Sequence, residues 1–173
     1  IHDLRAAAHG AGIRITATPL SDRLVGTLAE TGFDALVINS SDVVNPRMLD
    51  VVAETRISFM LGTAMATLEE IDWAVDRLHD RGARNFCLLH GQHIMTTGNR
   101  GVPESEVSLN TIGFLADRYG VAVGFTDHTS SKEVPAIAAA HGARIITKHL
   151  APEAGWRGAD WQVTLTPNEM AEC

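Results

Sequence analysis

Short apolar runs alternate with amphipathic, helix-like segments along almost the whole chain, and this alternation limits the possible folds more than any other feature. The runs are Ile13–Thr18, Ala35–Ser40, Ile57–Thr63, Phe86–Gly91, Val121–His128 and Arg144–Leu150. Each is apolar almost throughout, as expected of strands buried on both faces of a parallel sheet. Asn45-Pro46 predicts one helix start, and the capping pair Thr67 and Glu70 predicts a helix to about Arg81 that stops at Gly82. The pattern predicts an α/β fold, whose most common closed form is a (β/α) barrel.

Both ends of the chain fall in helical patterns. Ile1 to His9 reads as helix without a capping residue before it, and a second capping box from Thr166 to Glu169 has almost no helix length after it. Six strands are too few for an eight-stranded barrel. We therefore expect residues 1–173 to be a partial barrel domain of a longer protein. The alternative is a complete, six-stranded open α/β domain.

Charge and cysteine content narrow the classes of partner. Fourteen basic and 21 acidic residues give a net charge of −7, which offers no general attraction to nucleic acids or anionic membranes. Cys87 lies in an apolar run and Cys173 at the terminus, so no disulfide framework is expected. No apolar run reaches about 18 residues and no signal-like start is present. We expect a soluble, cytoplasmic protein.

Two histidines, His128 and His149, close consecutive apolar runs and are 21 residues apart. That spacing is about one strand–helix–strand unit, so parallel neighbouring strands would bring both imidazoles to one sheet edge, where α/β folds place their chemistry. Neutral imidazole suits Mn, Fe, Co or Zn better than Mg or Ca, and two ligands leave positions open for water and substrate. The pair predicts a divalent metal site, although a strand-end histidine is more often a hydrogen-bonded structural residue.

Other polar residues also stand at strand ends. The hydroxyl-bearing ones are Thr18, Ser40, Thr63 and Thr126. Hydroxyls and free amides gathered at one edge can hold a phosphate, although each residue taken singly is typical of a structural position. Asp127 and Asp160 could orient the metal ligands or act as a base, and each alone is also a typical turn or cap residue.

The loop after the fourth apolar run is the longest, from Gln92 to about Glu104. Long loops at this edge commonly bind substrate, and a mobile, solvated loop is an equal alternative. His90 lies inside the preceding strand and is expected to be a core residue. The loop residues that could contact a polar substrate are Gln92, His93, Asn99 and Arg100.

Six segments stand in the order and spacing of a known family. They are Ala17-Thr18-Pro19, Ala64 to Ile71, Cys87-Leu88-Leu89-His90, Gly124 to Thr129, Lys148-His149-Leu150 and Gly158-Ala159-Asp160. Together they resemble the sialic acid synthase (N-acetylneuraminate synthase) family, and the match spans nearly the whole chain. The stretch Met65 to Ile71 and the histidine pair are specific in combination, although no single segment would suffice.

The resemblance implies a fold and a reaction. Members of the family fold as a (β/α)8 TIM barrel, of which this chain would supply strands three to eight, usually followed by an antifreeze-like domain donated across a homodimer. They condense phosphoenolpyruvate with an N-acetylated aminosugar such as N-acetylmannosamine, giving a nine-carbon sialic acid and inorganic phosphate. A divalent metal, typically Mn²⁺ (with Mg²⁺, Co²⁺ or Zn²⁺ possible), holds and polarises the sugar aldehyde. The C3 carbon of phosphoenolpyruvate attacks this aldehyde, water adds at C2, and phosphate leaves.

The resemblance also implies roles for single residues. His128 and His149 fall on the two metal histidines, and Asp160 falls on the acidic residue near the sugar, so these three are the expected catalytic residues. Thr18 and Ser40 fall on positions that contact phosphoenolpyruvate. The full expected set of substrate-binding residues is Thr18, Ser40, Thr63, His93, Thr126 and Asp127.

Several positions depart from the family pattern. Val37 stands where the family has the lysine that binds phosphoenolpyruvate, and Gly62 stands where it has a serine. His93 and Met95 replace an asparagine and a tyrosine. Losing a charge-assisted phosphate contact costs about 1.5–3 kcal/mol, roughly ten- to a hundredfold in affinity. Lys148 is not expected to compensate, because as the strand neighbour of a metal histidine its side chain should point to the opposite face.

The sequence therefore predicts a divergent, metal-dependent enzyme that forms a carbon–carbon bond between phosphoenolpyruvate and an acylated aminosugar. Two alternatives stay open. One is a metal-dependent aldolase or lyase on a related sugar acid, which would use His128, His149 and Asp160 without needing the lysine. The other is a sugar- or metal-binding relative that catalyses no reaction.

Overall fold

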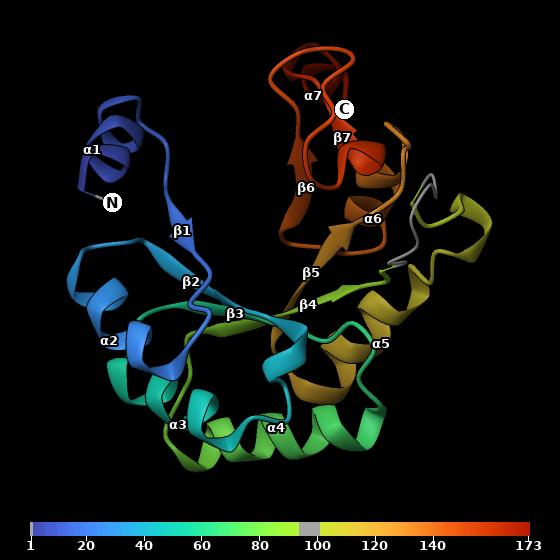
Figure 1. Ribbon diagram of the computed structural model, residues 1–173. Helices are drawn as coiled ribbons and strands as arrows, with labels where there is room; N and C mark the ends of the chain where they lie inside the picture. Colours follow the sequence, from blue (N-terminus) through green and yellow to red (C-terminus); the bar gives the residue numbers. More distant parts are fainter. Residues whose placement is uncertain (1, 94–100) are drawn as a thin grey trace. The chain divides into compact units, whose positions relative to one another are not determined.

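The computed structural model describes residues 2–93 and 101–173. The chain divides into two compact units, Ile1–Cys87 and Leu88–Cys173. In each unit short strands alternate with helices, and the paired strands run parallel (Figure 1). The predicted α/β fold is confirmed.

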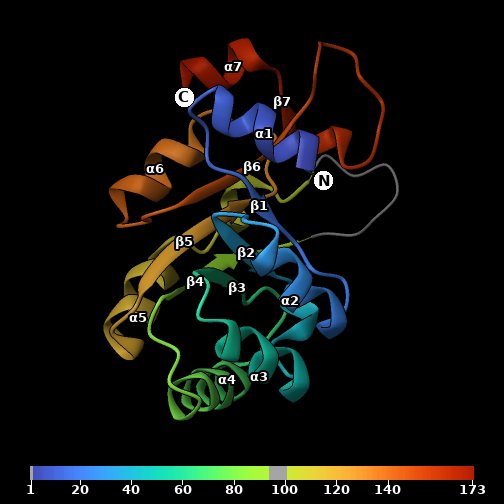
Figure 2. The ribbon, with the colours of Figure 1, turned by 90° about the vertical axis from the view of Figure 1, so that its left-hand side faces the viewer.

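The first unit is built from short parallel strands and the helices that join them. Its strands are β1 (Thr16–Ala17), β2 (Ala35–Ile38) and β3 (Phe59–Gly62), and β4 (Phe86–Gly91) begins at its end. Its helices are α1 (His2–Gly10), α2 (Asp22–Glu30), α3 (Pro46–Thr55) and α4 (Leu68–Asp80), with a 3-10 turn at Ser40–Asp42. Thr16 pairs with Ala35 and Leu36 with Phe59, so strand order follows chain order. Helices α2, α3 and α4 pack side by side in that order (Figure 2).

Two predicted helix starts are confirmed by their caps. The Asn45 side chain accepts a hydrogen bond from the backbone N–H of Met48, and Pro46 occupies the first turn of α3. At α4 the Thr67 hydroxyl accepts from the backbone N–H of Glu70, whose carboxylate accepts from the Thr67 N–H at 2.7 Å. These bonds satisfy donors that the first helical turn leaves free, so they fix where the two helices begin.

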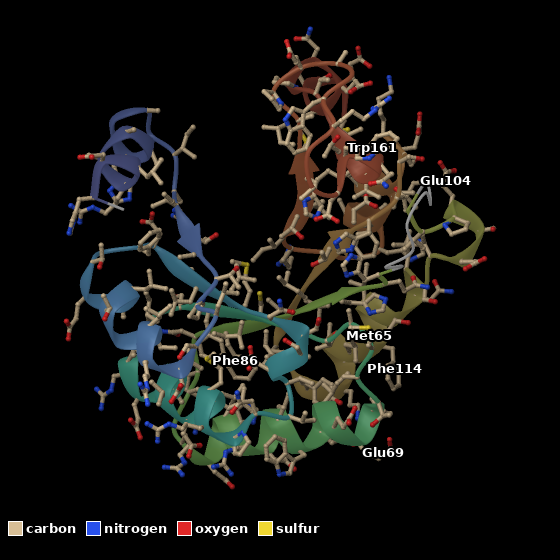
Figure 3. All side chains as sticks on the ribbon, in the orientation of Figure 1. Met65, Glu69, Phe86, Glu104, Phe114 and Trp161 are labelled. Atoms are coloured by element: carbon tan, nitrogen blue, oxygen red, sulfur yellow. The ribbon has the colours of Figure 1, made fainter. Side chains whose placement is uncertain are left out.

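The core of the first unit lies between its strands and helices α2 to α4. Its fully buried side chains include Val25, Leu36, Ile38, Met48, Leu49, Val52, Leu61, Ala74 and Leu78. Phe59 of β3 stacks on Phe86 of β4, with ring centroids 5.5 Å apart, and Figure 3 labels Phe86. The buried positions of α3 recur at helical spacing, which turns one face of that helix toward the strands.

The second unit continues β4 and adds β5 (Ala122–Asp127), β6 (Ile146–Leu150) and β7 (Thr164–Leu165). Its helices are α5 (Asn110–Tyr119), α6 (Val134–Ala140) and α7 (Pro167–Glu172), with 3-10 turns at Glu104–Glu106 and Trp161–Val163. Phe125 pairs with Ile146, and His149 pairs with Thr164. The core of this unit includes Leu88, Ile112, Leu115, Val123, Phe125 and Ala138.

The structure differs from the prediction in the extent of some strands. β7 is absent from the predicted strands, because its two residues are too few to stand out as an apolar run. The predicted first strand, Ile13–Thr18, is reduced to Thr16–Ala17. Ile13 is exposed, and the backbone N–H of Ile15 donates to the Asp34 carboxylate at 2.8 Å instead of to a strand.

Within the described ranges, no helix is both long enough and apolar enough to cross a membrane.

Candidate functional site

Three imidazole rings meet in the second unit. His93 lies two residues beyond β4, His128 directly follows β5, and His149 lies in β6. The His93 and His128 rings are stacked, with centroids 4.2 Å apart and planes 15° apart. The His149 ring lies on the other neighbouring strand, with its centroid 5.3 Å from that of His128 and tilted by 42°. The structure thus brings together the two predicted metal histidines and places His93 beside them.

His128 is held in one orientation and in its neutral form. Its Nδ1 lies 3.0 Å from the backbone carbonyl oxygen of Gln92, so Nδ1 carries the proton and Nε2 keeps a free lone pair. Burial, and then the neighbouring charges of His93 and His149, lower the pKa of His128 below its usual value. The contact with Gln92 and the charge of Asp160 oppose this lowering of the pKa. A neutral imidazole with one fixed tautomer is what a metal ligand requires.

Asp160 approaches this group from the segment between β6 and β7. Its carboxylate is exposed, and its charge acts on His128. The backbone of Asp160 is in the left-handed region, with φ of 55°, immediately before the 3-10 turn that begins at Trp161, labelled in Figure 3. An exposed carboxylate near a predicted metal histidine can accept a hydrogen bond from a bound substrate.

Asp127 does not face the site in the way that a substrate-binding role requires. Its carboxylate is fully buried and pairs with Lys148, whose Nζ lies 2.8 Å from one carboxylate oxygen. The other oxygen accepts from the backbone N–H of Thr129 at 2.7 Å, and Lys148 also donates to the Thr129 carbonyl at 2.6 Å. Successive residues of a strand point to opposite faces. Asp127 therefore points away from the face to which its neighbour His128 points. The expected direct contact of Asp127 with substrate is therefore corrected to a structural ion pair.

Two threonines occupy the strand positions before the histidines. Thr126 of β5, which is half-buried, pairs with Thr147 of β6. The Thr147 hydroxyl is buried and has no hydrogen-bond partner among the described residues. By strand alternation, Thr147 lies on the same face as His149. Thr147 is not among the residues predicted from sequence. The signal that could have found it is a polar side chain in an apolar strand, two residues before a predicted metal histidine.

A glycine and a main-chain hydrogen bond fix the backbone of His128. The backbone N–H of Val102 donates to the His128 carbonyl oxygen at 2.8 Å. Gly101 has a φ of 82°, and a Cβ there would collide with that same carbonyl oxygen and with Val163. Only glycine combines this backbone conformation with so close an approach.

The structure describes only some of the residues predicted in and around the loop after β4. His90 is buried, and its Nε2 lies 3.0 Å from the Ser108 carbonyl oxygen, which confirms the prediction of a core residue. The Gln92 side chain donates to the carbonyl of Glu106 and accepts from the backbone N–H of Ser108, so it braces the chain. The predicted contact residues Asn99 and Arg100, and the departure at Met95, lie outside the described residues.

The remaining candidate residues belong to the first unit. Thr18 follows β1 and is exposed, Ser40 follows β2, and Thr63 follows β3 and is buried. Val37 lies in β2, where it pairs with Met60. All three hydroxyl residues therefore stand at strand ends in this unit, whereas Thr126 stands in the second unit.

Gly62 explains one departure from the family pattern. A Cβ at Gly62 would lie 2.8 Å from the backbone nitrogen of Ser40. The end of β3 therefore comes so close to the residue after β2 that a serine at position 62 would force the two backbones apart.

The donor set fits a divalent metal held by two histidines. His128 offers Nε2, and His149 offers a second imidazole beside it. In the part of the chain that the structure describes, no group of three or more His, Cys, Asp or Glu side chains could hold a metal ion. A two-histidine site leaves its other positions to water and substrate oxygens, as a Lewis-acid centre requires.

Comparison with known sequences gives a consistent set of relatives. The sequence model described as the NeuB family matches residues 1–173. An N,N'-diacetyllegionaminic acid synthase of Campylobacter jejuni is 32% identical over 160 residues, which cover 91% of this chain and 46% of that protein. An uncharacterized protein of Methanocaldococcus jannaschii is 31% identical over 171 residues, which cover 99% of this chain and 49% of that protein. The chain spans about half the length of these curated relatives.

Solved structures agree with the sequence matches. The N-acetylneuraminic acid (sialic acid) synthetase of Leptospira borgpetersenii, in complex with citrate, superposes with a TM-score of 0.89 at 29% identity. The match covers 99% of this chain and 58% of that one. A phospho-2-dehydro-3-deoxyheptonate aldolase of Thermotoga maritima, 19% identical over 98% of this chain and 51% of its own, has a TM-score of 0.81 and shows the fold alone. These matches confirm the prediction of a partial (β/α)8 barrel.

Proposed function

Because the chain belongs to the NeuB family, we propose that it forms the metal-binding part of a synthase that condenses phosphoenolpyruvate with an N-acetylated aminosugar. Relatives named as legionaminic and sialic acid synthases support a sugar-acid product. The observation that carries the proposal is the pair His128 and His149, with ring centroids 5.3 Å apart on neighbouring strands. The sugar that we propose is of the N-acetylmannosamine type, and the product is a nine-carbon sugar acid.

We propose Mn²⁺ as the metal and His128 and His149 as its protein ligands, with Mg²⁺, Co²⁺ and Zn²⁺ as alternatives. When bound, the metal would supply Lewis-acid polarisation of the sugar aldehyde. The protein supports this by holding the Nδ1 proton of His128 on the Gln92 carbonyl, which keeps Nε2 directed to the site. Burial, which lowers the pKa of His128, favours the neutral ring that binds a metal at neutral pH.

We propose Asp160 as the catalytic carboxylate near the sugar. It is exposed, and its charge acts on His128, so it can contact a substrate beside the metal. A carboxylate in this position can hold a sugar hydroxyl or take a proton from the water that adds during the reaction. Thr126 and His93 are the side chains of the same unit that we propose to contact the substrate.

We propose that the phosphate of phosphoenolpyruvate is bound by Thr18, Ser40 and Thr63 of the first unit. These residues offer hydroxyl and backbone donors but no positive charge. Val37 cannot supply a charge-assisted contact, so we expect affinity for phosphoenolpyruvate about ten- to a hundredfold below that of relatives that have the lysine.

The test is phosphate release by the whole protein, given phosphoenolpyruvate, Mn²⁺ and a panel of N-acetylated hexosamines. We expect release that depends on the sugar, falls strongly in Asp160→Asn, and vanishes in His128→Ala. Binding of Mn²⁺, measured separately by electron paramagnetic resonance, should be lost in His128→Ala and kept in Asp160→Asn. Sugar-independent release, or none with Mn²⁺ still bound, would overturn the synthase proposal.

The altered phosphoenolpyruvate position favours one second candidate, a metal-dependent aldolase or lyase on a related sugar acid. Such an enzyme would use His128, His149 and Asp160 and would not need a lysine at Val37. The discriminating assay is cleavage of sialic or legionaminic acid with Mn²⁺ and no phosphoenolpyruvate. Cleavage without synthesis would select the lyase, and metal binding without either reaction would select a binding protein.

For the whole protein we further propose a cytoplasmic homodimer that binds small molecules and neither nucleic acid nor membrane. Light scattering on the purified whole protein tests the dimer, since a monomeric mass would contradict it.

A further inference from the structure

A cavity in the first unit is lined by none of the residues proposed above to bind metal or substrate. It has a volume of about 280 Å³ and is formed where α3 leads into β3 and where α4 leads into β4. Arg56, Arg81 and Arg84 line it, and no aspartate or glutamate is among the described residues of its wall. The cavity therefore carries three positive charges in a chain whose net charge is −7.

Two of these guanidinium groups are only partly engaged. Arg81 lies 2.7 Å from the Asp50 carboxylate, which also binds Arg77 through two contacts of 2.8 Å. One carboxylate is thus shared between two cations, and it cannot neutralise both. Arg84 donates through a single terminal nitrogen to two backbone carbonyl oxygens, at 3.1 and 2.8 Å. In the part of the chain that the structure describes, its other donors have no partner and could bind a ligand.

Arg56 is the third cation and is held in an unusual backbone conformation. It caps the end of α3 with a φ of 57°, in the left-handed region where glycine is favoured. Among the described residues, its side chain makes no hydrogen bond or ion pair. A non-glycine residue is strained in this conformation, and Arg56 places a guanidinium that has no partner among the described residues on the cavity wall.

We propose that this cavity binds a small anion through phosphate or carboxylate oxygens. A guanidinium group can bind two oxygens of one phosphate or carboxylate through two parallel hydrogen bonds. The volume of the cavity suits a small metabolite rather than a macromolecule. The cavity lies at the start of β3, whereas Thr63 follows the end of that strand. The anion site is therefore separate from the strand-end residues assigned to phosphoenolpyruvate, and it does not depend on the proposed reaction.

Isothermal titration of the whole protein with inorganic phosphate, and separately with citrate, tests this site and distinguishes the two kinds of anion. We expect Arg56→Gln to weaken binding of the preferred anion about tenfold, and Arg56→Gln/Arg84→Gln to abolish it. The matched control is Arg14→Gln/Arg144→Gln, which removes the same charge from positions before β1 and β6, away from the cavity wall. This control should bind the anion as the unaltered protein does.

The single variant Arg56→Gln keeps the test valid if the double variant fails to fold, because no described side-chain bond is lost with it. The proposal is overturned if neither anion binds, if Arg56→Gln binds as tightly as the unaltered protein, or if the control loses as much affinity as the double variant. Unchanged anion binding in His128→Ala would show that the site is separate from the metal site.

Discussion

Lys148 and Asp127 form a buried ion pair, with side-chain exposed fractions of 2% and 0%, at the position immediately before His149 and His128. The two residues are register partners on β6 and β5. The pair therefore joins the two strands one step before the two histidines that we propose as metal ligands. A fixed spacing between ligands is a requirement of a two-histidine metal site.

Removing one partner of this pair should be strongly destabilising. We expect Lys148→Met to lower the free energy of unfolding by about 3–5 kcal/mol, because it leaves the buried Asp127 carboxylate without its counter-charge. The double variant Lys148→Met/Asp127→Leu should recover much of this loss, because no unpaired charge is left. Urea denaturation measures both. Equal loss in the single and double variants would show that the charge is not the cause.

Gly101 should matter through its contact with His128. We expect Gly101→Ala to destabilise the protein by about 1–3 kcal/mol more than Gly142→Ala, because only the first introduces a steric clash as well as backbone strain. Gly142 has a φ of 96°, but a Cβ added there would meet nothing within 4 Å. Thermal unfolding gives the comparison. If the proposal of a Mn²⁺ site at His128 holds, Mn²⁺ affinity should fall only in Gly101→Ala. Equal effects of the two substitutions would count against the close approach.

The two cysteines should react at very different rates. Burial raises the pKa of the Cys87 thiol to about 11, whereas Cys173 is exposed. At pH 8 only about one Cys87 in a thousand is thiolate, the reactive form. We expect one thiol per chain to react rapidly with a disulfide reagent and the second only after unfolding. Fast reaction of the native Cys173→Ser variant would contradict this.

Acidification should destabilise the protein through His90. Burial lowers the pKa of His90 in the folded protein below its usual 6.5. As the pH falls, His90 therefore takes up a proton in the unfolded state before it does so in the folded state. The stability that neutral His90 contributes is present above pH 6.5 and falls as the pH drops from there toward the lowered folded-state pKa. We expect His90→Gln to reduce this slope in urea denaturation at pH 5 to 7.5, with the exposed His141→Gln as control. His128, whose pKa is also lowered, should leave a residual slope of the same sign. An unchanged slope in His90→Gln would be contrary to expectation.

Restoring a lysine at position 37 should improve use of phosphoenolpyruvate. If the synthase proposal holds, Val37→Lys should lower the KM for phosphoenolpyruvate about tenfold or more, because it adds a charge-assisted phosphate contact. Val37→Met changes size without charge and should leave KM unchanged. Steady-state phosphate release gives both values. If Val37→Lys lowered the KM for the sugar instead, position 37 would lie near the sugar and not near phosphoenolpyruvate, which would contradict this prediction.

Much of the arrangement of the candidate site can be predicted from strand periodicity in the sequence. Where that periodicity is weak or was not applied, the prediction fails. The closeness of His128 and His149 follows from a spacing of one strand–helix–strand unit between parallel neighbours. The same alternation indicates that Lys148 points away from His149. It also indicates that Asp127 points away from His128, and the expected contact of Asp127 with substrate did not take this into account. A two-residue strand such as β7 carries too little pattern to predict.

Other parts of the site depend on contacts between residues distant in sequence. Gly101 meets His128 because the chain returns to β5 after the loop, and nothing in the local sequence specifies that return. The unpartnered hydroxyl of Thr147 depends likewise on what surrounds it on the folded strand among the described residues. Sequence patterns identify candidate ligands, whereas their supporting contacts come from the tertiary structure.

The partner that orients His128 is a main-chain carbonyl, that of Gln92. Every amino acid has such a group, so residue 92 can change during evolution while the imidazole keeps its tautomer. Comparison of related sequences would therefore miss this partner, because its role leaves no trace in residue identity. An insertion or deletion that shifts the chain after β4 would have the opposite effect, since it moves the carbonyl even where every side chain is retained. The path of this segment, rather than its composition, is what selection on the orientation of His128 would preserve.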